Sequence, residues 1–322
     1  MGKKLFVTMS DANYLHTAKA LFSSLYWNAG WKGDCMLLTH NVPEKDLKWF
    51  RDRGILVRGC KLLEDGRERT HSAMCFTKFY VFGVEFKKWD NVIYVDSDAI
   101  VRASLDGISD VKGFWAVNDA MDLSRNVLVD IEEGELPKLK EFKSIYNPKS
   151  KALNSGVLVF STDIIERGTF NELLRLLREF GGIDRSADQL LIALLFYNKW
   201  RELPIVYNML YPIHAKTYGI PDNKVDGIIL HFATLEKRYK PWTPGSLFYE
   251  EWRGYLERAD AINFNRPTPG AKRVWSKRDI TEYTKYIERR KRIAGVKRIP
   301  LRIAVLGLKQ ARKVLGIKGH NY

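Results

Sequence analysis

The chain has 322 residues, of which 45% are hydrophobic and 12% aromatic, which excludes a mostly disordered protein and allows one large α/β domain with an appendage. Its three cysteines follow no paired spacing, which argues against a disulfide framework or a zinc site. The net charge is +15, but residues 271–322 hold 16 Lys or Arg against 3 Asp or Glu, so the basicity belongs to the C-terminal region.

Strands and helices alternate along much of the chain. Short apolar runs predict strands, and apolar residues spaced three and four apart predict helices. The expected strands are residues 3–9, 34–39, 54–58, 91–95, 114–117, 153–160 and 228–232. The expected helices are residues 15–25, 43–50, 77–86, 171–180 and 186–197, and the polar stretch 122–151 is expected to run over the surface, where it could serve as a lid. The alternation predicts a doubly wound, mostly parallel, Rossmann-like α/β sheet.

Two aspartates directly follow an almost wholly apolar strand of this sheet. Asp96 and Asp98 come after residues 91–95, at the carboxyl end of the strand, where such sheets bind their ligands. Two carboxylates this close repel one another unless a cation lies between them, and a divalent ion would satisfy both and also bind a diphosphate. The alternative is an ordinary turn, since Asp-Ser-Asp also favours turns and helix caps.

Five motifs in a fixed order resemble the glycogenin-like family 8 of retaining glycosyltransferases, which includes bacterial lipooligosaccharide sugar transferases. The resemblance covers residues 4–245. Its motifs are Phe-Val-Thr-Met at residues 6–9 with Tyr14, Thr77-Lys78 ahead of Asp96-Ser97-Asp98, Asn154-Ser155-Gly156, Asp188-Gln189, and His231 followed by Lys240-Pro241-Trp242. The resemblance implies a nucleotide-sugar-binding domain of the GT-A type. It also implies transfer of a hexose from a UDP-sugar to a hydroxyl acceptor with retention of anomeric configuration.

The resemblance assigns roles to particular residues. Asp96, Asp98 and His231 would bind Mn²⁺, because a mixed oxygen and nitrogen site suits manganese better than magnesium, and Mg²⁺ is the alternative. Asp188 and Gln189 would face the anomeric carbon, where a carboxylate and an amide stabilise an oxocarbenium-like transition state. The residues expected to bind the donor are Val7, Thr8, Met9, Tyr14, Lys78, Asp96, Ser97, Asp98, Asp119, Asn154, Ser155 and Lys240.

One spacing departs from the family pattern. The interval from His231 to Lys240 is longer than in the family, and Thr234 stands where the family has glycine. Lys237 lies at the family's spacing, whereas Lys240 precedes the Pro-Trp pair. Either lysine could contact the diphosphate, and we favour Lys240.

We expect residues 1–250 to form the catalytic domain and residues 251–322 a basic helical region. Beyond residue 300 the apolar residues fall near one helical face, and a basic amphipathic helix favours an anionic membrane surface. Residues 271–322 would then bring the enzyme to a carbohydrate or glycolipid acceptor. Packing of this helix on the catalytic domain, and binding of nucleic acid, are the alternatives.

No secretory signal opens the chain, and its longest apolar run, residues 190–197, is too short to cross a bilayer. We therefore expect a cytoplasmic protein, either free or peripheral on the inner face of a membrane.

Other functions are compatible with the same residues. The enzyme could glycosylate an anionic polymer such as modified DNA. A non-catalytic nucleotide-sugar or nucleic-acid binding protein would bind a nucleotide without turning over a donor. A nucleotidyltransferase or phosphohydrolase would also use paired carboxylates and a metal, but would release nucleoside monophosphate from the donor.

Overall fold

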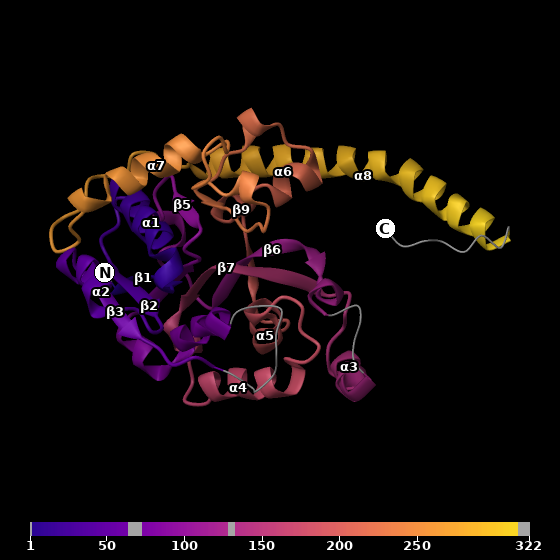
Figure 1. The fold of residues 1–322 in the computed structure, drawn as a ribbon, viewed down its shortest axis with the longest axis horizontal. Coiled ribbons are helices and arrows are strands. Elements are labelled where there is room, and N and C mark those ends of the chain that lie inside the picture. Colours follow the sequence, from indigo (N-terminus) through magenta and orange to yellow (C-terminus); the bar gives the residue numbers. More distant parts are fainter. Residues whose placement is uncertain (1, 64–72, 128–132, 315–322) are drawn as a thin grey trace.

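The structure is a computed structural model that describes residues 2–63, 73–127 and 133–314, with the side chains of residues 120, 121 and 296–314 left undescribed. Its centre is a seven-stranded sheet in the order β3-β2-β1-β4-β7-β6-β8 (Figure 1). The strands are β1 (Lys4–Ser10), β2 (Asp34–Thr39), β3 (Ile55–Gly59), β4 (Asn91–Val95), β6 (Phe114–Asp122), β7 (Lys151–Ser161) and β8 (Arg201–Leu203).

The first half of the sheet is built from parallel strands joined by helices. β1 pairs in parallel with both β2 and β4, and β2 pairs in parallel with β3. The connections are α1 (Leu15–Asn28) and α2 (Glu44–Asp52). All five residues of β4 are buried, as expected of a central strand covered on both faces. β4 therefore brings its carboxyl end, and Asp96 after it, to the edge of the sheet where ligands bind.

β7 runs against its two neighbours. It pairs antiparallel with β4 and with β6, while β8 is parallel to β6, so the sheet is mostly parallel as predicted. The predicted last strand belongs to a second sheet in which β10 (Ile229–His231) lies between β5 (Ala99–Val101) and β9 (Met209–Leu210). In this small sheet β5, which begins directly after Asp98, pairs with β10, so that Asp98 and the end of β10 lie next to each other.

Two hydrophobic cores cover the two faces of the large sheet. In β1, Phe6 faces one core with α1 and α2, whereas Leu5 and Val7 face the other. The second core contains residues of α3 (Leu136–Ile145), α4 (Thr169–Phe180) and α5 (Asp188–Leu195). Figure 1 shows α4 and α5 on one side of the sheet and α6 (Ile213–Tyr218), α7 (Tyr249–Glu257) and α8 (Lys277–Val314) on the other.

Two expectations need correction. Residues 73–88 form the 3₁₀ turns Ala73–Phe82 and Val84–Lys88, where the apolar spacing predicted an α-helix over residues 77–86. The stretch 122–151, expected as a surface excursion, contains α3, whose Phe142 is buried in the second core. Residues 128–132 of that stretch lie outside the described residues, so its role as a lid stays a prediction.

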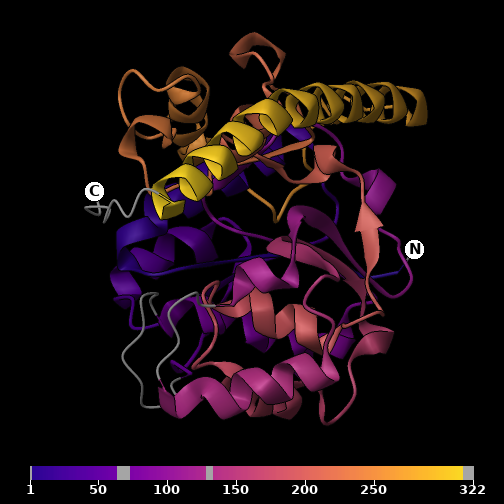
Figure 2. The same ribbon diagram turned by 90° about the vertical axis from the view of Figure 1, so that its right-hand side faces the viewer.

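The chain beyond residue 250 adds to the first core. Trp252, Ile262, Trp275 and Ile287 are buried there with residues of α1 and β5. In Figures 1 and 2, α7 and α8 lie on the same side of the molecule. The start of α8, as far as Ile287, therefore packs on the domain, whereas the side chains after residue 300, where the amphipathic pattern lies, are outside the described residues. Within the part of the chain that the structure describes, no helix is both long enough and apolar enough to cross a membrane.

Candidate functional site

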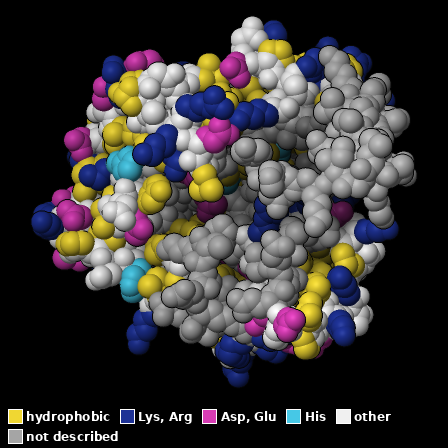
Figure 3. Space-filling view, turned by 45° about the vertical axis from the view of Figure 1, so that its right-hand side comes forward, with side chains coloured by type: hydrophobic (Ala, Val, Ile, Leu, Met, Phe, Trp, Pro, Cys, Tyr) yellow, Lys and Arg dark blue, Asp and Glu magenta, His cyan; other side chains and the backbone are white. Residues whose placement is uncertain are grey.

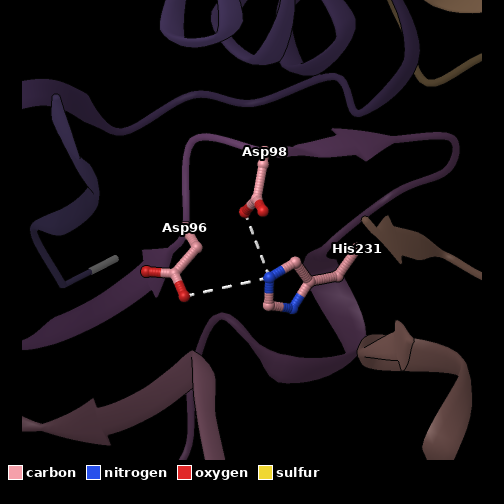
Figure 4. A group of neighbouring side chains, drawn as sticks. All are labelled: Asp96, Asp98 and His231. Atoms are coloured by element: carbon pink, nitrogen blue, oxygen red, sulfur yellow. Dashed lines mark ion pairs between the residues drawn. The ribbon is translucent and has the colours of Figure 1, made fainter. Parts of the chain in front are cut away.

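Two aspartates and one histidine converge where β4, β5 and β10 meet. Asp96 follows β4, Asp98 precedes β5 and His231 ends β10 (Figure 4). His231 Nε2 lies 3.1 Å from Asp98 Oδ1 and 3.8 Å from Asp96 Oδ2. One ligand atom from each residue lies within 4.8 Å of the others. Two carboxylates and an imidazole nitrogen in this arrangement form a suitable donor set for a divalent ion.

Backbone hydrogen bonds hold this convergence in place. The amide of Asp96 donates to the carbonyl of Gly156 at 2.8 Å, which joins the end of β4 to β7. The amide of Phe232 donates to the carbonyl of Asp98 at 2.9 Å, and His231 pairs with Ala99 in the antiparallel ladder of β10 and β5. The three side chains are thus fixed by two sheets.

Glycine is required at residue 156 because the ring of His231 passes directly over it. A Cβ placed there would lie 2.1 Å from His231 Cε1 and 2.4 Å from His231 Nδ1. Real Cβ atoms do not approach another atom this closely, so any larger residue must displace the ring. Gly156 was part of the Asn-Ser-Gly motif, but its contact with His231 could not be read from the sequence.

The ionisable groups of the cluster shift one another. Burial raises the pKa of Asp96, and Lys78 and His231 offset only part of this effect. Burial also acts to raise the pKa of Asp98, but His231 and Lys240 outweigh it and lower this pKa. Burial acts to lower the pKa of His231, whereas Asp98 and Asp96 raise it overall. The negative charges of Asp96 and Asp98 therefore favour a positive charge in the space between these carboxylates and His231 Nε2.

Lys78 lies inside the protein, between two aspartates. Its side chain is 1% exposed, and its Nζ lies 2.7 Å from Asp188 Oδ2 and 3.2 Å from Asp96 Oδ1. It also donates to the carbonyl and the hydroxyl of Ser155 at 3.0 and 3.2 Å. Burial opposes its charge, but Asp188 and Asp96 raise the pKa of Lys78 above its ordinary value. Lys78 thus links the aspartate after β4 to the aspartate that opens α5.

The amides expected to face the sugar form a second cluster beside the first. Asn154 Nδ2 donates to Asp119 Oδ1 and to Gln189 Oε1, both at 3.1 Å. Gln189 Nε2 donates to Asp119 Oδ2 at 3.2 Å and to Asn126 Oδ1 at 3.3 Å. Each carboxylate oxygen of Asp119 therefore accepts from a different amide. Burial raises the pKa of Asp119, and these two amides oppose the rise.

A strained residue precedes Asp188. Ala187 has φ 57° and ψ −114°, a conformation that a residue with a Cβ rarely adopts. Such strain is concentrated at functional sites, where the surrounding structure enforces it. Here the strained residue directly precedes α5, in which Asp188 lies against Lys78 and Gln189 against Asn154. Nothing in the local sequence signals this conformation.

A cavity of about 640 Å³ is lined by most of these side chains, whereas Asp119, which was also expected to bind the donor, lies behind Asn154 and Gln189 and outside the wall. Its lining comes from β1 and the following turn, from the segments around Asp96 and Asp188, and from the loop after His231. The expected residues on its wall are Met9, Tyr14, Lys78, Asp96, Ser97, Asp98, Asn154, Ser155, Asp188, Gln189, His231 and Lys240. Cys75 lines the cavity as well. Burial, and to a smaller extent the negative charge of nearby Asp188, raises the pKa of its thiol to about 12.

Other expected residues lie outside this wall. Val7 and Thr8 are fully buried within β1, directly before Met9. Of the two lysines considered for the diphosphate, Lys240 lines the cavity, with its Nζ 5.9 Å from the ring centre of Tyr14. Lys237 is exposed in the 3₁₀ turn Lys237–Tyr239. This placement favours Lys240.

A family model and several known proteins match this chain in sequence. The family model of glycosyl transferase family 8 matches residues 6–244. Glycosyltransferase GlyA of Streptococcus pneumoniae is 22% identical over 188 residues, which cover 57% of this chain and 24% of GlyA. Galactinol synthase 5 of Arabidopsis thaliana is 23% identical over 235 residues, which cover 68% of this chain and 66% of the synthase.

A solved structure has the same fold. The galactosyltransferase LgtC in complex with donor and acceptor sugar analogues matches with a TM-score of 0.60 at 15% identity. The match covers 80% of this chain and 96% of LgtC. The predicted α/β fold of the GT-A type is confirmed.

Proposed function

The chain belongs to glycosyl transferase family 8, and from this we propose that it transfers a hexose from a UDP-sugar to a hydroxyl acceptor with retention of anomeric configuration. The observation that carries the proposal is the cluster of Asp96, Asp98 and His231 on the wall of the same cavity as Asn154, Asp188 and Gln189. A diphosphate and a sugar joined to it need two such neighbouring clusters, one for charge and one for hydroxyl groups.

The charged cluster fits a divalent metal ion, and we propose Mn²⁺. The donor atoms are two carboxylate oxygens and one imidazole nitrogen that meet on one side of Gly156, where only a hydrogen atom leaves room for the ring. When bound there, the ion would neutralise the negative charge that develops on the departing diphosphate. Lys240, on the same cavity wall, adds a second positive charge for the phosphates.

The neighbouring cluster would hold and activate the sugar. Asp119, Asn154 and Gln189 offer fixed donors and acceptors to its hydroxyl groups, and Asp188 with Gln189 would stabilise positive charge at the anomeric carbon. In the transfer, the acceptor oxygen bonds to the anomeric carbon and the bond to the diphosphate breaks. The acceptor's proton passes to the departing diphosphate. Lys78 keeps Asp188 in position through the ion pair at 2.7 Å.

A panel of nucleotide sugars tests this function. With Mn²⁺ present, a UDP-hexose is expected to raise the unfolding temperature by mass action and to release UDP, slowly with water and faster with a sugar acceptor. Release of UMP instead would assign a phosphohydrolase or nucleotidyltransferase. Stabilisation without any release, across all acceptors offered, would assign a binding protein.

We further propose that the acceptor is a glycan at an anionic membrane surface, reached through the basic residues 271–322. On the face shown in Figure 3, Lys and Arg side chains are scattered among acidic and hydrophobic ones. In the described part of α8, Lys285, Arg289 and Arg292 are exposed at spacings of four and three, although the exposed Glu282 and Glu288 lie beside them. That spacing places the three cations on one stripe of the helix, pointing away from buried Ile287.

Neutralising this stripe is expected to release the protein from anionic vesicles. Each well-placed cation contributes about 1 kcal/mol to binding an anionic surface. Replacing Lys285, Arg289 and Arg292 together by Gln should therefore weaken flotation with phosphatidylserine vesicles roughly 100-fold. UDP-hexose turnover with a soluble acceptor should stay unchanged, because the stripe lies outside the cavity.

Two results would contradict the membrane assignment. One is equal flotation of the wild type with neutral and anionic vesicles. The other is a tighter shift of duplex DNA than of vesicles, which would identify an anionic polymer as the partner.

A further inference from the structure

Asn208 is a buried residue that touches both clusters of the site, and no motif in the chain pointed to its role. It follows the 3₁₀ turn Ile205–Tyr207, precedes β9 and is fully buried. Its Oδ1 lies 3.0 Å from His231 Nδ1, and its Nδ2 donates to Asn154 Oδ1 at 2.7 Å. Both ends of one amide are thus used, one on the histidine of the charged cluster and one on the asparagine of the sugar-facing cluster.

The direction of these hydrogen bonds is fixed by neighbouring groups that can only accept or only donate a hydrogen bond. The carboxylate of Asp119 accepts from Asn154, so the nitrogen of the Asn154 side chain must face Asp119. The amide N–H of Gly156 donates to the other end of the Asn154 side chain at 3.0 Å, which must therefore be the oxygen. That oxygen can only accept, so Asn208 must turn its own nitrogen toward Asn154 and its oxygen toward His231.

The same logic sets the tautomer of His231. An oxygen of Asn208 facing His231 Nδ1 requires that Nδ1 carry a hydrogen. In the neutral ring the lone pair then lies on Nε2, the nitrogen that faces Asp96 and Asp98. The chain of hydrogen bonds from Asp119 through Asn154 and Asn208 to His231 therefore leaves the lone pair on Nε2, where it can bind a metal.

We propose that Asn208 is a positioning residue that holds His231 in its metal-binding tautomer and couples it to the sugar-facing amides. The inference rests on the proposed function, since it concerns the same metal and sugar clusters. Groups that donate to or accept from a metal-binding histidine typically change metal affinity 10- to 100-fold when they are removed. Asn208 would in addition transmit any displacement of His231 to Asn154, and through it to Gln189.

Binding of Mn²⁺ in the absence of any sugar donor tests the proposal directly. The signal of free Mn²⁺ in electron paramagnetic resonance reports the affinity of the full-length protein without using its activity. Asn208→Leu removes both hydrogen bonds and should lower this affinity about 10- to 100-fold. Asn208→Asp keeps an oxygen for His231 but loses the donor to Asn154. It should therefore keep the affinity within about threefold of wild type while the kcat for UDP release falls.

Asn28→Leu is the matched control. Asn28 is also buried, and its side chain also makes two hydrogen bonds, both through Nδ2, to the carbonyl of Val101 at 2.7 Å and to the hydroxyl of Tyr255 at 2.8 Å. It lies outside the cavity wall, so the variant should lose stability but keep wild-type Mn²⁺ affinity. If Asn208→Leu binds Mn²⁺ as tightly as Asn28→Leu, Asn208 serves packing alone and the proposal is overturned. A wild-type protein that binds no Mn²⁺ would instead overturn the metal-dependent function on which it rests.

Discussion

Replacing Asp98 by asparagine is expected to lower the release of UDP from a UDP-hexose by about 10³-fold at saturating donor. Asp98 Oδ1 is the carboxylate oxygen nearest to His231 Nε2, at 3.1 Å, and His231 and Lys240 lower the pKa of this carboxyl, so that it is ionised at neutral pH. Asparagine keeps the size of the side chain but removes the charge. The proposed metal site would then lose one of its two anionic ligands, and Mn²⁺ affinity should fall with the rate.

The fold should survive this change, which makes the result interpretable. The hydrogen bond that joins Asp98 to Phe232 uses the backbone carbonyl of Asp98, not its side chain. Asp110→Asn is the control, since it removes an exposed carboxylate that does not line the cavity. Both variants should unfold at temperatures close to that of the wild type. A variant Asp98→Asn that keeps wild-type Mn²⁺ affinity and turnover would exclude Asp98 as a metal ligand.

The elements that the sequence predicted well are those in which local pattern and burial agree. Residues 91–95 are apolar without interruption after Asn91 and form β4, which is buried throughout. The direction of β7 could not be predicted, because an apolar strand reads alike in both directions. Its antiparallel pairing with β4 and β6 depends on the path that the chain takes between them. The turns of residues 73–88 have helix-like apolar spacing, and only tertiary packing decides between 3₁₀ and α geometry.

For the site, ordered motifs identified the residues, and the structure adds how they meet. Asp96, Asp98 and His231 were predicted to share a metal, and the structure brings their ligand atoms within 4.8 Å. Lys78 was predicted to contact the donor, and it lines the cavity with its ammonium held by Asp96 and Asp188. A signal for this was present: Lys78 stands in an apolar run between Phe76 and Val81, where a charge needs a buried partner.

Asn208 and Ala187 were missed for a different reason. A single asparagine has no spacing that distinguishes a buried hydrogen-bond bridge from a turn residue. The strained backbone at Ala187 cannot be recognised from the residue type, because alanine is common in helices, strands and loops alike. Both features arise only when distant segments are packed together, as residues 154, 208 and 231 are here.

Gly156→Ala is expected to weaken Mn²⁺ binding strongly while leaving the protein folded. The new Cβ would fall 2.1 Å from His231 Cε1, so the ring must rotate out of the position in which Nε2 faces Asp96 and Asp98. Inserting a methyl group into such a packed place typically costs about 1–3 kcal/mol of unfolding free energy. Losing the one nitrogen ligand should weaken Mn²⁺ binding by at least about 100-fold, because removing only a hydrogen-bond partner of a metal ligand can already lower metal affinity by that factor.

Gly254→Ala separates this effect from the general cost of adding a methyl group. Gly254 lies in α7, and a Cβ added to it would meet no atom within 4 Å, so alanine fits there and favours the helix by about 1 kcal/mol. The control should bind Mn²⁺ normally and unfold at a slightly higher temperature. Because His231 is also tied to Asn208, the displaced ring in Gly156→Ala should disturb Asn154, so UDP release should fall even at Mn²⁺ concentrations that saturate the variant. Normal Mn²⁺ affinity in a folded Gly156→Ala protein would mean that His231 does not bind the ion from this position.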